Sequence, residues 1–486
     1  QMLGAKSKVS CAFAASPFVV RPLPVKGRAM EGLSSLSDDD ESTGSTDLTD
    51  APTQEHRGFV AAVSNFSIQY NFACATVATA VMMSDNDETG PKVHPDFLEP
   101  NWAQETLLSL VFIGSVFGML TMGYLGDLIG IRRALLVTNS LTVFGSLASA
   151  CLSWGRAETV WTVIAVSRFV LGVGVGGNYP LGAAKASEST PSLEEATRKA
   201  ADAFFWQGPG SCAPYLLGLL LLFLPSSDFR TSLQFRVLLG FGAIPSLVVL
   251  WAAAQEPPSE RVAQPRDRLN GALADPQNRW ALVGTAGSWL LFDVAFYGNM
   301  IFVPVILSRV FGEGQSLSDI AWHGAFLSFL GIIGTMGGVF AVHYIRPKTL
   351  NTVGLTIGAA LFAAFALVYS LHSIPAVLFT LLCALFFVLY FSANIATYLL
   401  PVVSFPPDAR STFHGLSAAA GKVGAMLGAL LFPMVERHFG GITAVMGMQA
   451  CICLAGAFVS HVFVDNEGLH KTDTFREGTE LQHWKS

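Results

Sequence analysis

Residues Thr285–Val303 read TAGSWLLFDVAFYGNMIFV, an apolar stretch that carries a carboxylate, Asp293, at its centre. Trp289, Asp293 and Tyr297 are spaced i, i+4 and i+8, so on a helix their side chains share one face. A carboxylate at mid-membrane costs roughly 2.5–3.5 kcal/mol on insertion scales, so it normally faces a protein interior or a watery path. The stretch therefore predicts a membrane helix with a polar, aromatic-flanked face toward a substrate cavity. The alternative is a structural aspartate paired with a neighbouring helix.

The composition is that of a helical membrane protein that crosses the bilayer many times. Of the 486 residues, 51% are hydrophobic and only 13% are charged, whereas a soluble domain carries about 25% charged residues. The net charge of −6 argues against a nucleic-acid partner. None of the seven cysteines shows metal-ligand spacing with a histidine, so we expect no metal site and no cofactor.

Apolar segments long enough to cross a hydrocarbon core of ~30 Å fall into two sets of six. They lie near 58–83, 103–124, 134–153, 159–183, 201–224, 233–254, 280–308, 321–343, 350–371, 375–400, 412–434 and 440–463. This layout predicts an all-α membrane protein made of two six-helix bundles. The expected parts are a disordered tail at 1–56, bundles at 57–254 and 280–464, a linker at 255–279 and a tail at 465–486.

The loops predict the orientation in the lipid bilayer. Lys and Arg are more frequent in the loops on the side of the two tails, so we expect both termini and the linker to be cytoplasmic. We expect a multi-pass protein of the plasma membrane. An organelle envelope is the alternative, because the first thirty residues hold basic side chains and no acid, a weak likeness to a transit peptide.

Residues 123–133, GYLGDLIGIRR, lie between the second and third segments. Their glycines allow a tight turn, and Asp127, Arg132 and Arg133 can bridge helix ends. The stretch resembles the loop signature of the major facilitator superfamily, in which it latches one conformation of the bundle. The resemblance implies the major facilitator fold, with twelve transmembrane helices in two bundles.

Three further stretches are similar to one branch of that superfamily. Residues 172–188, GVGVGGNYPLGAAKASE, resemble the GGDYPLS…SE signature of the phosphate:proton symporter family. The stretch that begins at Thr285 resembles that family's seventh helix. Residues 394–401, NIATYLLP, and 405–424, FPPDARSTFHGLSAAAGKVG, resemble its tenth and eleventh helices. The similarity covers about residues 58–464 and implies transport of inorganic phosphate by alternating access.

Carried over by motif, the family's phosphate site falls on Tyr179, Gln207, Trp289, Asp293, Tyr297 and Asn394, with Lys422 as a nearby cation. Hydroxyl, indole and amide groups are neutral donors that suit a tetrahedral oxyanion. An ionised Asp293 repels phosphate, whereas a protonated one can donate to it, so this residue is the candidate for proton coupling. Each residue also has a structural interpretation: aromatic packing, an amide that ties two helices, or a lysine that snorkels or pairs with a carboxylate.

The sequence departs from the family at three carboxylates. Ile68, Asn71 and Asn178 stand where the family has Asp. The coupling therefore stays open between proton symport and uniport, exchange or use of a different cation. We interpret the charged and imidazole groups of Arg168, Glu188 and His414 as structural.

Two other functions remain as alternatives. One is a porter of another small anion, such as a phosphorylated metabolite, and the other is a phosphate sensor that does not transport. An enzyme is the least supported class, because apart from Asp293 the cavity residues form no nucleophile–base pair or metal cluster.

Overall fold

In a computed structural model, the described part of the chain is 54–83, 100, 102–187, 192–224, 230–255, 265–312, 315–371, 374–405 and 407–465. Most of the two predicted tails and residues 256–264 of the predicted linker lie outside it. The remainder of the linker contains a short helix, α9 (Pro265–Ala274).

Every one of the twelve predicted segments coincides with a helix or with a broken helix. The first set consists of α1 (Gln54–Met83), α2 (Ala103–Ile129), α3 (Ile131–Cys151), α4 (Ala157–Ser187), α5 (Leu193–Phe205), α6 (Gln207–Leu221), α7 (Arg230–Phe241) and α8 (Ala243–Gln255). The second consists of α10 (Pro276–Ile301), α11 (Val303–Phe311), α12 (Leu317–Ala341), α13 (Pro347–Ser370), α14 (Pro375–Leu389), the π-helical turn η2 (Tyr390–Asn394), α15 (Ile395–Ser404), α16 (Pro407–His438) and α17 (Gly441–Phe463). The all-α fold is the predicted one.

Ten stretches of the described chain are long and apolar enough to cross a membrane. The two predicted segments missing from these ten are α1 and the broken helix α5–α6. Helix α1 carries Asn65, Gln69 and Asn71, all of them buried inside the protein. A helix surrounded by other helices can hold such polar groups because they meet protein partners instead of lipid.

Four of the predicted segments are broken, which the sequence analysis did not anticipate. The breaks lie at Trp206, Gly242 and Phe302 and at the turn η2. A break frees backbone groups that must find partners inside the membrane. At the break, the backbone carbonyl of Gly242 accepts a hydrogen bond of 3.2 Å from Nδ2 of Asn71 in α1. A side-chain amide in one helix thus stabilises the break in another.

Glycines set the distance between α2 and α4. A Cβ atom added to Gly118 would lie 2.1 Å from the backbone oxygen of Val173, and one added to Gly176 would lie 2.2 Å from that of Ser115. The two backbones are therefore in direct contact, as small residues allow in membrane helices. The glycine-rich stretch from residue 172 has this packing role in the structure.

The second bundle repeats the arrangement between α10 and α16. A Cβ atom on Gly424 would lie 2.0 Å from the backbone oxygen of Leu290, and one on Gly428 would lie 2.5 Å from that of Val294. These contacts lie one residue after Trp289 and Asp293, respectively. The close approach of the helices therefore brings the polar face of α10 against α16.

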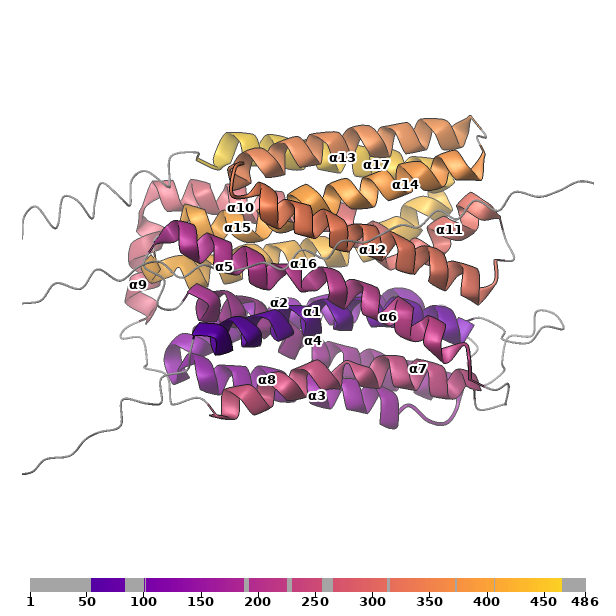
Figure 1. Ribbon diagram of the computed structural model, residues 1–486, viewed down its shortest axis with the longest axis horizontal. Helices are drawn as coiled ribbons and strands as arrows, with labels where there is room; N and C mark the ends of the chain where they lie inside the picture. The colour runs from indigo at the N-terminus through magenta and orange to yellow at the C-terminus, as the bar shows by residue number, and fades with distance from the viewer. Residues whose placement is uncertain are drawn as a thin grey trace, which may run out of the picture. The chain divides into compact units, whose positions relative to one another are not determined.

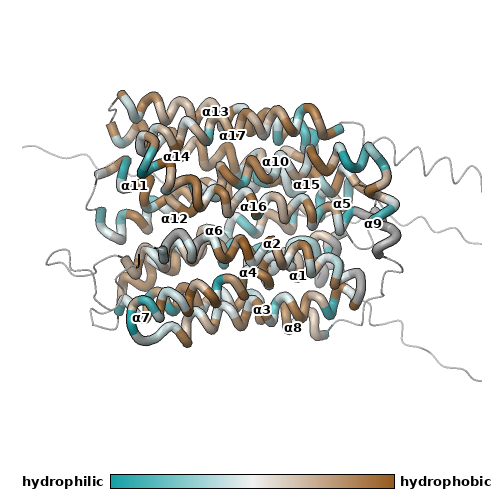
Figure 2. The backbone as a smooth tube through the Cα atoms, turned by 180° about the vertical axis from the view of Figure 1, so that it is seen from behind, coloured by the Kyte–Doolittle hydropathy of each residue, from teal (hydrophilic) through white to brown (hydrophobic). Residues whose placement is uncertain are grey.

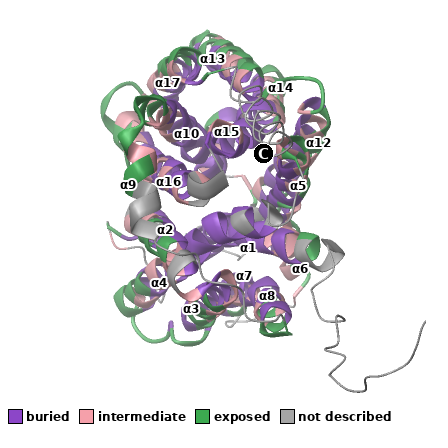
Figure 3. Ribbon diagram, turned by 90° about the vertical axis from the view of Figure 1, so that its left-hand side faces the viewer, coloured by how far each residue is buried: buried purple, intermediate pink, exposed green. Residues whose placement is uncertain are grey.

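The two sets of helices meet mainly where α2 and α4 pack against α16, α6 against α12, and α5 against α15 and α12. Figure 1 shows the indigo-to-magenta helices of the first set beside the pink-to-yellow helices of the second set. In the end view of Figure 3, buried residues colour α1, α10 and α15 in the interior, whereas exposed residues lie on outward faces such as those of α3 and α13.

Large apolar side chains cover the outward faces of several helices. Phe144, Trp251 and Phe458 are each at least 60% exposed. Figure 2 shows hydrophobic residues along the middle of the helices and hydrophilic ones gathered toward their ends. Exposed aromatic side chains on this scale mark a surface that faces lipid.

The α2–α4 contact gives a prediction for Gly176→Ala. Because the new methyl group would meet the backbone oxygen of Ser115, which cannot rotate away, we expect a loss of about 1–3 kcal/mol of stability. Gly182→Ala in the same helix is the control, since no atom lies within 4 Å of its added Cβ. Thermal unfolding of the purified variants in detergent measures both. If Gly176→Ala melts at the same temperature as Gly182→Ala, the close contact between α2 and α4 is contradicted.

Candidate functional site

An ion pair joins α10 and α16, two helices of the second bundle, in the interior of the protein. Nζ of Lys422 lies 2.9 Å from Oδ2 of Asp293, and both side chains are at most 2% exposed. Removing two charges from water is costly, so such a pair persists only where good geometry and further partners compensate for lost hydration. Asp293 is thus paired with a residue of a neighbouring helix, and that residue, Lys422, is itself one of the predicted site residues.

Aromatic side chains surround the ammonium group of Lys422. Nζ donates a hydrogen bond of 3.0 Å to the hydroxyl of Tyr297. It also lies 4.1 Å from the ring centre of Tyr297, 5.1 Å from that of Phe72 and 5.3 Å from that of Tyr179. These rings come from α10, α1 and α4, so both bundles contribute to a cage of aromatic faces, which attract a cation.

Helix α1 supplies two amides to the site, which the sequence analysis missed. The hydroxyl of Tyr297 donates to Oε1 of Gln69 over 3.3 Å. One turn earlier, Nε2 of Gln207 in α6 donates to Oδ1 of Asn65 over 2.8 Å. Asn65, Gln69 and Phe72 are spaced i, i+4 and i+7, and this polar stripe in a membrane segment is the signal that could have identified them.

Trp289 forms a wall of the site beside the ion pair. Its indole lies against Gly421, where an added Cβ would be 2.8 Å from the indole nitrogen. Its ring centre is 6.4 Å from that of Tyr179 and 5.6 Å from that of His414. Nε2 of His414 lies 3.2 Å from the backbone oxygen of Tyr398, which fixes the imidazole against the indole.

Asn394 is the last residue of the π-helical turn η2. Such turns occur as single-turn bulges inside α-helices and are frequent at functional sites. The side chain of Asn394 is 7% exposed, and its Nδ2 has no hydrogen-bond partner among the described residues. A buried amide donor without a partner is available to a ligand.

The structure joins five of the seven predicted residues into one cluster. Tyr179, Trp289, Asp293, Tyr297 and Lys422 are linked by the contacts given above. In the described chain, Gln207 and Asn394 make no hydrogen bond to either charged residue. Gln207 is connected to the cluster through the polar stripe of α1.

Two asparagines that replace family carboxylates have partners of their own. Asn178 and Asn139 form a reciprocal pair, with Nδ2 of Asn139 3.0 Å from Oδ1 of Asn178 and the opposite contact at 3.3 Å. Besides its bond to Gly242, Asn71 accepts from the hydroxyl of Ser146 over 3.2 Å. Each amide uses a donor that an ionised Asp would lack.

The predicted latch is described in part. Arg132 donates from Nε to the backbone oxygen of Ala253 over 3.0 Å and from Nη2 to that of Ala254 over 2.7 Å, at the end of α8. Arg133 is exposed, and the side chain of Asp127 lies outside the described part. The turn before α3 is at Gly130, whose φ of 91° favours glycine.

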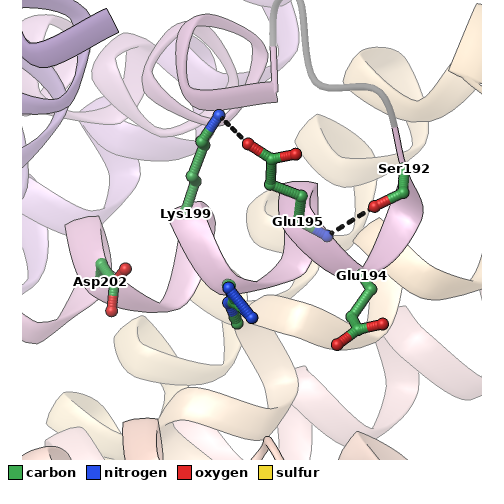
Figure 4. A pocket seen from close by; sticks show the side chains of 6 residues that line it. Ser192, Glu194, Glu195, Lys199 and Asp202 are labelled. Atoms are coloured by element: carbon green, nitrogen blue, oxygen red, sulfur yellow. Dashed lines mark hydrogen bonds and ion pairs between the residues drawn. The ribbon is translucent and has the colours of Figure 1, made fainter. Parts of the chain in front are cut away.

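A surface hollow lies beside the first turns of α5, away from the central cluster. Figure 4 shows Ser192 capping Glu195 and the ion pair between Glu195 and Lys199. Glu194 and Asp202 also line the hollow. With three carboxylates against Lys199 and Arg198, its charge does not favour an anion.

Comparisons with known proteins agree with the fold. The sequence pattern of the Major Facilitator Superfamily matches residues 59–429. Among solved structures, the proton:xylose symporter XylE bound to 6-bromo-6-deoxy-D-glucose superposes with a TM-score of 0.69 at 16% identity, covering 85% of this chain and 96% of that one.

Several sequence relatives carry names that refer to phosphate. "Inorganic phosphate transporter PT2" of Toxoplasma gondii is 33% identical over 91% of this chain and 76% of its own length. "Inorganic phosphate transporter 1-6" of Oryza sativa subsp. japonica is 28% identical over 77% of this chain and 81% of its own. "Glycerophosphocholine permease GIT4" of Candida albicans is 24% identical over 78% of this chain and 74% of its own.

The reciprocal amide pair predicts the effect of Asn178→Asp. An ionised Asp cannot donate, so Oδ1 of Asn139 would lose its partner in the interior, and we expect a loss of about 1–3 kcal/mol of stability. The same substitution at Asn270, an exposed residue of α9, is the control. Thermal unfolding of the detergent-purified variants near neutral pH measures the difference. If Asn178→Asp unfolds at the same temperature as the wild type, the Asn139–Asn178 pair does not contribute to stability.

Proposed function

The chain belongs to the major facilitator superfamily, a family of transporters rather than enzymes, and we propose that it moves inorganic phosphate across a membrane by alternating access. The cluster around Asp293 and Lys422 carries the proposal. It offers one buried cation and several neutral donors to a tetrahedral oxyanion. The names of the relatives that cover most of the chain support the same substrate.

Lys422 is the group that exchanges partners when phosphate binds. In the structure its ammonium is held by Asp293 and Tyr297, and a phosphate oxygen can replace the carboxylate as acceptor. A charge-assisted hydrogen bond of this kind is about twice as strong as one between neutral groups. The hydroxyls of Tyr179 and Tyr297 and the amide of Asn394 then supply the remaining donors.

The two bundles share the site, as alternating access requires. Tyr179 and Gln207 come from the first bundle, whereas Asp293, Asn394 and Lys422 come from the second. All of the seven site side chains are at most 7% exposed, so substrate enters only when the bundles move apart on one side. Arg132 at the end of α8 supports the proposed role of residues 127–133 as a conformational latch.

We propose that the coupling differs from ordinary proton symport. Among the buried side chains that the structure describes, Asp293 is the only carboxylate. Asn71, Asn178 and Ile68 occupy the other family positions, and the two amides bond to other protein groups. With Asp293 as the single buried carboxylate of the described chain, and no second one there to pass a proton on, uniport, exchange or another cation is favoured.

A phosphorylated metabolite is the second candidate substrate, since one relative is named a glycerophosphocholine permease. Competition for radiolabelled phosphate uptake by glycerophosphocholine and by sugar phosphates separates the two. Binding of phosphate without any flux in proteoliposomes would instead indicate a sensor.

The unpartnered amide of Asn394 leads to a binding prediction. Loss of a hydrogen bond to a charged ligand is worth about 1.5–3 kcal/mol, so Asn394→Ala should weaken phosphate binding by roughly ten- to a hundred-fold. Asn351→Ala is the control, because that buried amide bonds to Ser460 and lies in α13, outside the site. Calorimetric titration of both purified variants tests the assignment. Wild-type affinity in Asn394→Ala would show that this amide is structural.

The ion pair predicts the behaviour of Asp293→Asn. The variant keeps Lys422 as the cation and removes the carboxylate that repels an anion, so phosphate should bind at least as tightly as in the wild type. Because the titratable group is gone, the part of the pH dependence of transport that comes from Asp293 should disappear, whereas the part that comes from the titration of phosphate itself should remain. Uptake across pH, with and without a proton gradient, measures this. Steep accumulation driven by the gradient in the wild type would refute altered coupling.

We propose the plasma membrane as the location, with an organelle envelope as the alternative and both termini cytoplasmic. Single cysteines introduced into the loop at 84–100 and the linker at 255–279 test the orientation with an impermeant label on intact cells. The first should react from outside and the second should not. Reaction of both from one side would overturn the topology. Immunolocalisation of a tagged chain distinguishes the two membranes.

A further inference from the structure

A buried guanidinium lies in the first bundle, and among the described residues it has no carboxylate partner. Arg168, in the middle of α4, is 0% exposed. Its Nη2 donates to the backbone oxygen of Asn71, and its Nη1 lies 3.6 Å from Sγ of Cys74. Nε has no hydrogen-bond partner in the described chain. Arginine stays protonated in proteins, so this is a permanent positive charge inside the membrane.

The buried charges of the described interior do not cancel. Asp293 neutralises Lys422 through their ion pair, which leaves Arg168 as the remaining charge near mid-membrane. Two other buried cations lie near the ends of their spans. Lys185 is in the last turn of α4, and the guanidinium of Arg236 stacks 3.7 Å from the ring centre of Trp154, which is half exposed. The empty site region therefore carries a net charge of about +1 in a medium of low dielectric constant.

Arg168 acts on the site from behind α1. Asn71 and Phe72 are neighbours in that helix, and successive residues point to different faces. The backbone of Asn71 accepts from Arg168, whereas the ring of Phe72 packs against Lys422. Only one helix thus separates the permanent charge from the ion pair, so Arg168 affects a bound anion through its field without touching it.

We propose that this protein is an obligatory anion exchanger, in which bound dihydrogen phosphate neutralises the permanent charge of Arg168 and allows the bundles to rock. The inference rests on the proposed phosphate transport. When the site is loaded with the monoanion, the charges of Arg168, Lys422, Asp293 and phosphate sum to zero. When the site is empty, the protein would have to pass through the closed state while it carries an unbalanced charge. In that state the charge is out of reach of water from both sides, which is costly.

The sequence of events needs no proton. Phosphate enters from one side, the neutral complex isomerises, and phosphate leaves on the other side. Another anion must then bind before the protein returns. Net uptake is therefore slow, whereas one-for-one exchange is fast and moves no net charge.

The wild-type protein in liposomes provides the first test. Initial uptake of radiolabelled phosphate is compared between vesicles loaded with unlabelled phosphate and vesicles without it. Valinomycin with equal potassium on both sides holds the potential at zero, so that charge accumulation cannot limit net uptake. We expect uptake about ten-fold faster or more in the loaded vesicles. Equal rates would overturn the exchange inference, whereas no uptake in either would refute phosphate transport itself.

Cys74→Asp tests whether the charge of Arg168 is the cause. Cys74 is a free, buried thiol in contact with the guanidinium, so a carboxylate at this position would pair with Arg168 and bring the empty site to neutrality. Cys74→Asn has the same shape without the charge. We expect Cys74→Asp to take up phosphate at similar rates into empty and loaded vesicles, both slower than wild-type exchange, because its empty form is neutral whereas its loaded form carries a charge of about −1. We expect Cys74→Asn to keep the ten-fold preference of the wild type.

The pair of variants separates charge from shape. If both keep the preference for loaded vesicles, the charge of Arg168 does not enforce exchange. If both lose it, the side-chain volume and not the charge is responsible. Either result overturns the proposed role of Arg168. Exchange by Cys74→Asn in loaded vesicles, and calorimetric binding of phosphate to purified Cys74→Asp, show that the variants are folded.

Discussion

The ion pair between Asp293 and Lys422 is the interaction on which the rest of the site depends. Two charges inside a membrane protein need close geometry and further partners. The backbone contacts between α10 and α16 at Gly424 and Gly428 provide the close geometry. Larger side chains at these glycines would hold the helices apart and lengthen the ion pair. The aromatic rings around the ammonium group of Lys422 provide the further partners. Packing glycines and functional charges are thus parts of one arrangement.

Helix α1 connects this pair to the first bundle through its two faces. Gln69 and Phe72 face the ion pair, while Asn71 and Cys74 meet Arg168 and the break of the helix at Gly242. Because the amide of Asn71 donates to the carbonyl of Gly242 at the break, it ties α1 to the junction of α7 and α8. An ionised carboxylate there would face that carbonyl without a proton to share. The loss of a family Asp at this position therefore has a structural counterpart.

The sequence predicted the fold well because long apolar segments and small-residue motifs are local signals. It also indicated the cluster around Asp293, since the i, i+4, i+8 spacing survives in α10. The breaks at Gly242 and at η2 were missed, because each depends on partners from distant helices. The contribution of Gln69 was missed for the same reason: its role appears only when Tyr297, which lies far away in the sequence, donates to it. Arg168 was interpreted as structural, and that no described carboxylate pairs with it could be seen only in three dimensions.

The replacement of carboxylates by amides changes the charge of the interior more than its shape. The pair of Asn139 and Asn178 satisfies its hydrogen bonds internally and stays neutral at every pH. Near mid-membrane, the described chain nevertheless keeps two basic side chains, Lys422 and Arg168, and one carboxylate, Asp293. A protein with this distribution can reach neutrality by binding an anion, whereas one with additional carboxylates can do so by binding or releasing protons. In the mechanism that we propose, the balance of buried charge, rather than the identity of the groups that bind phosphate, therefore sets how transport is coupled.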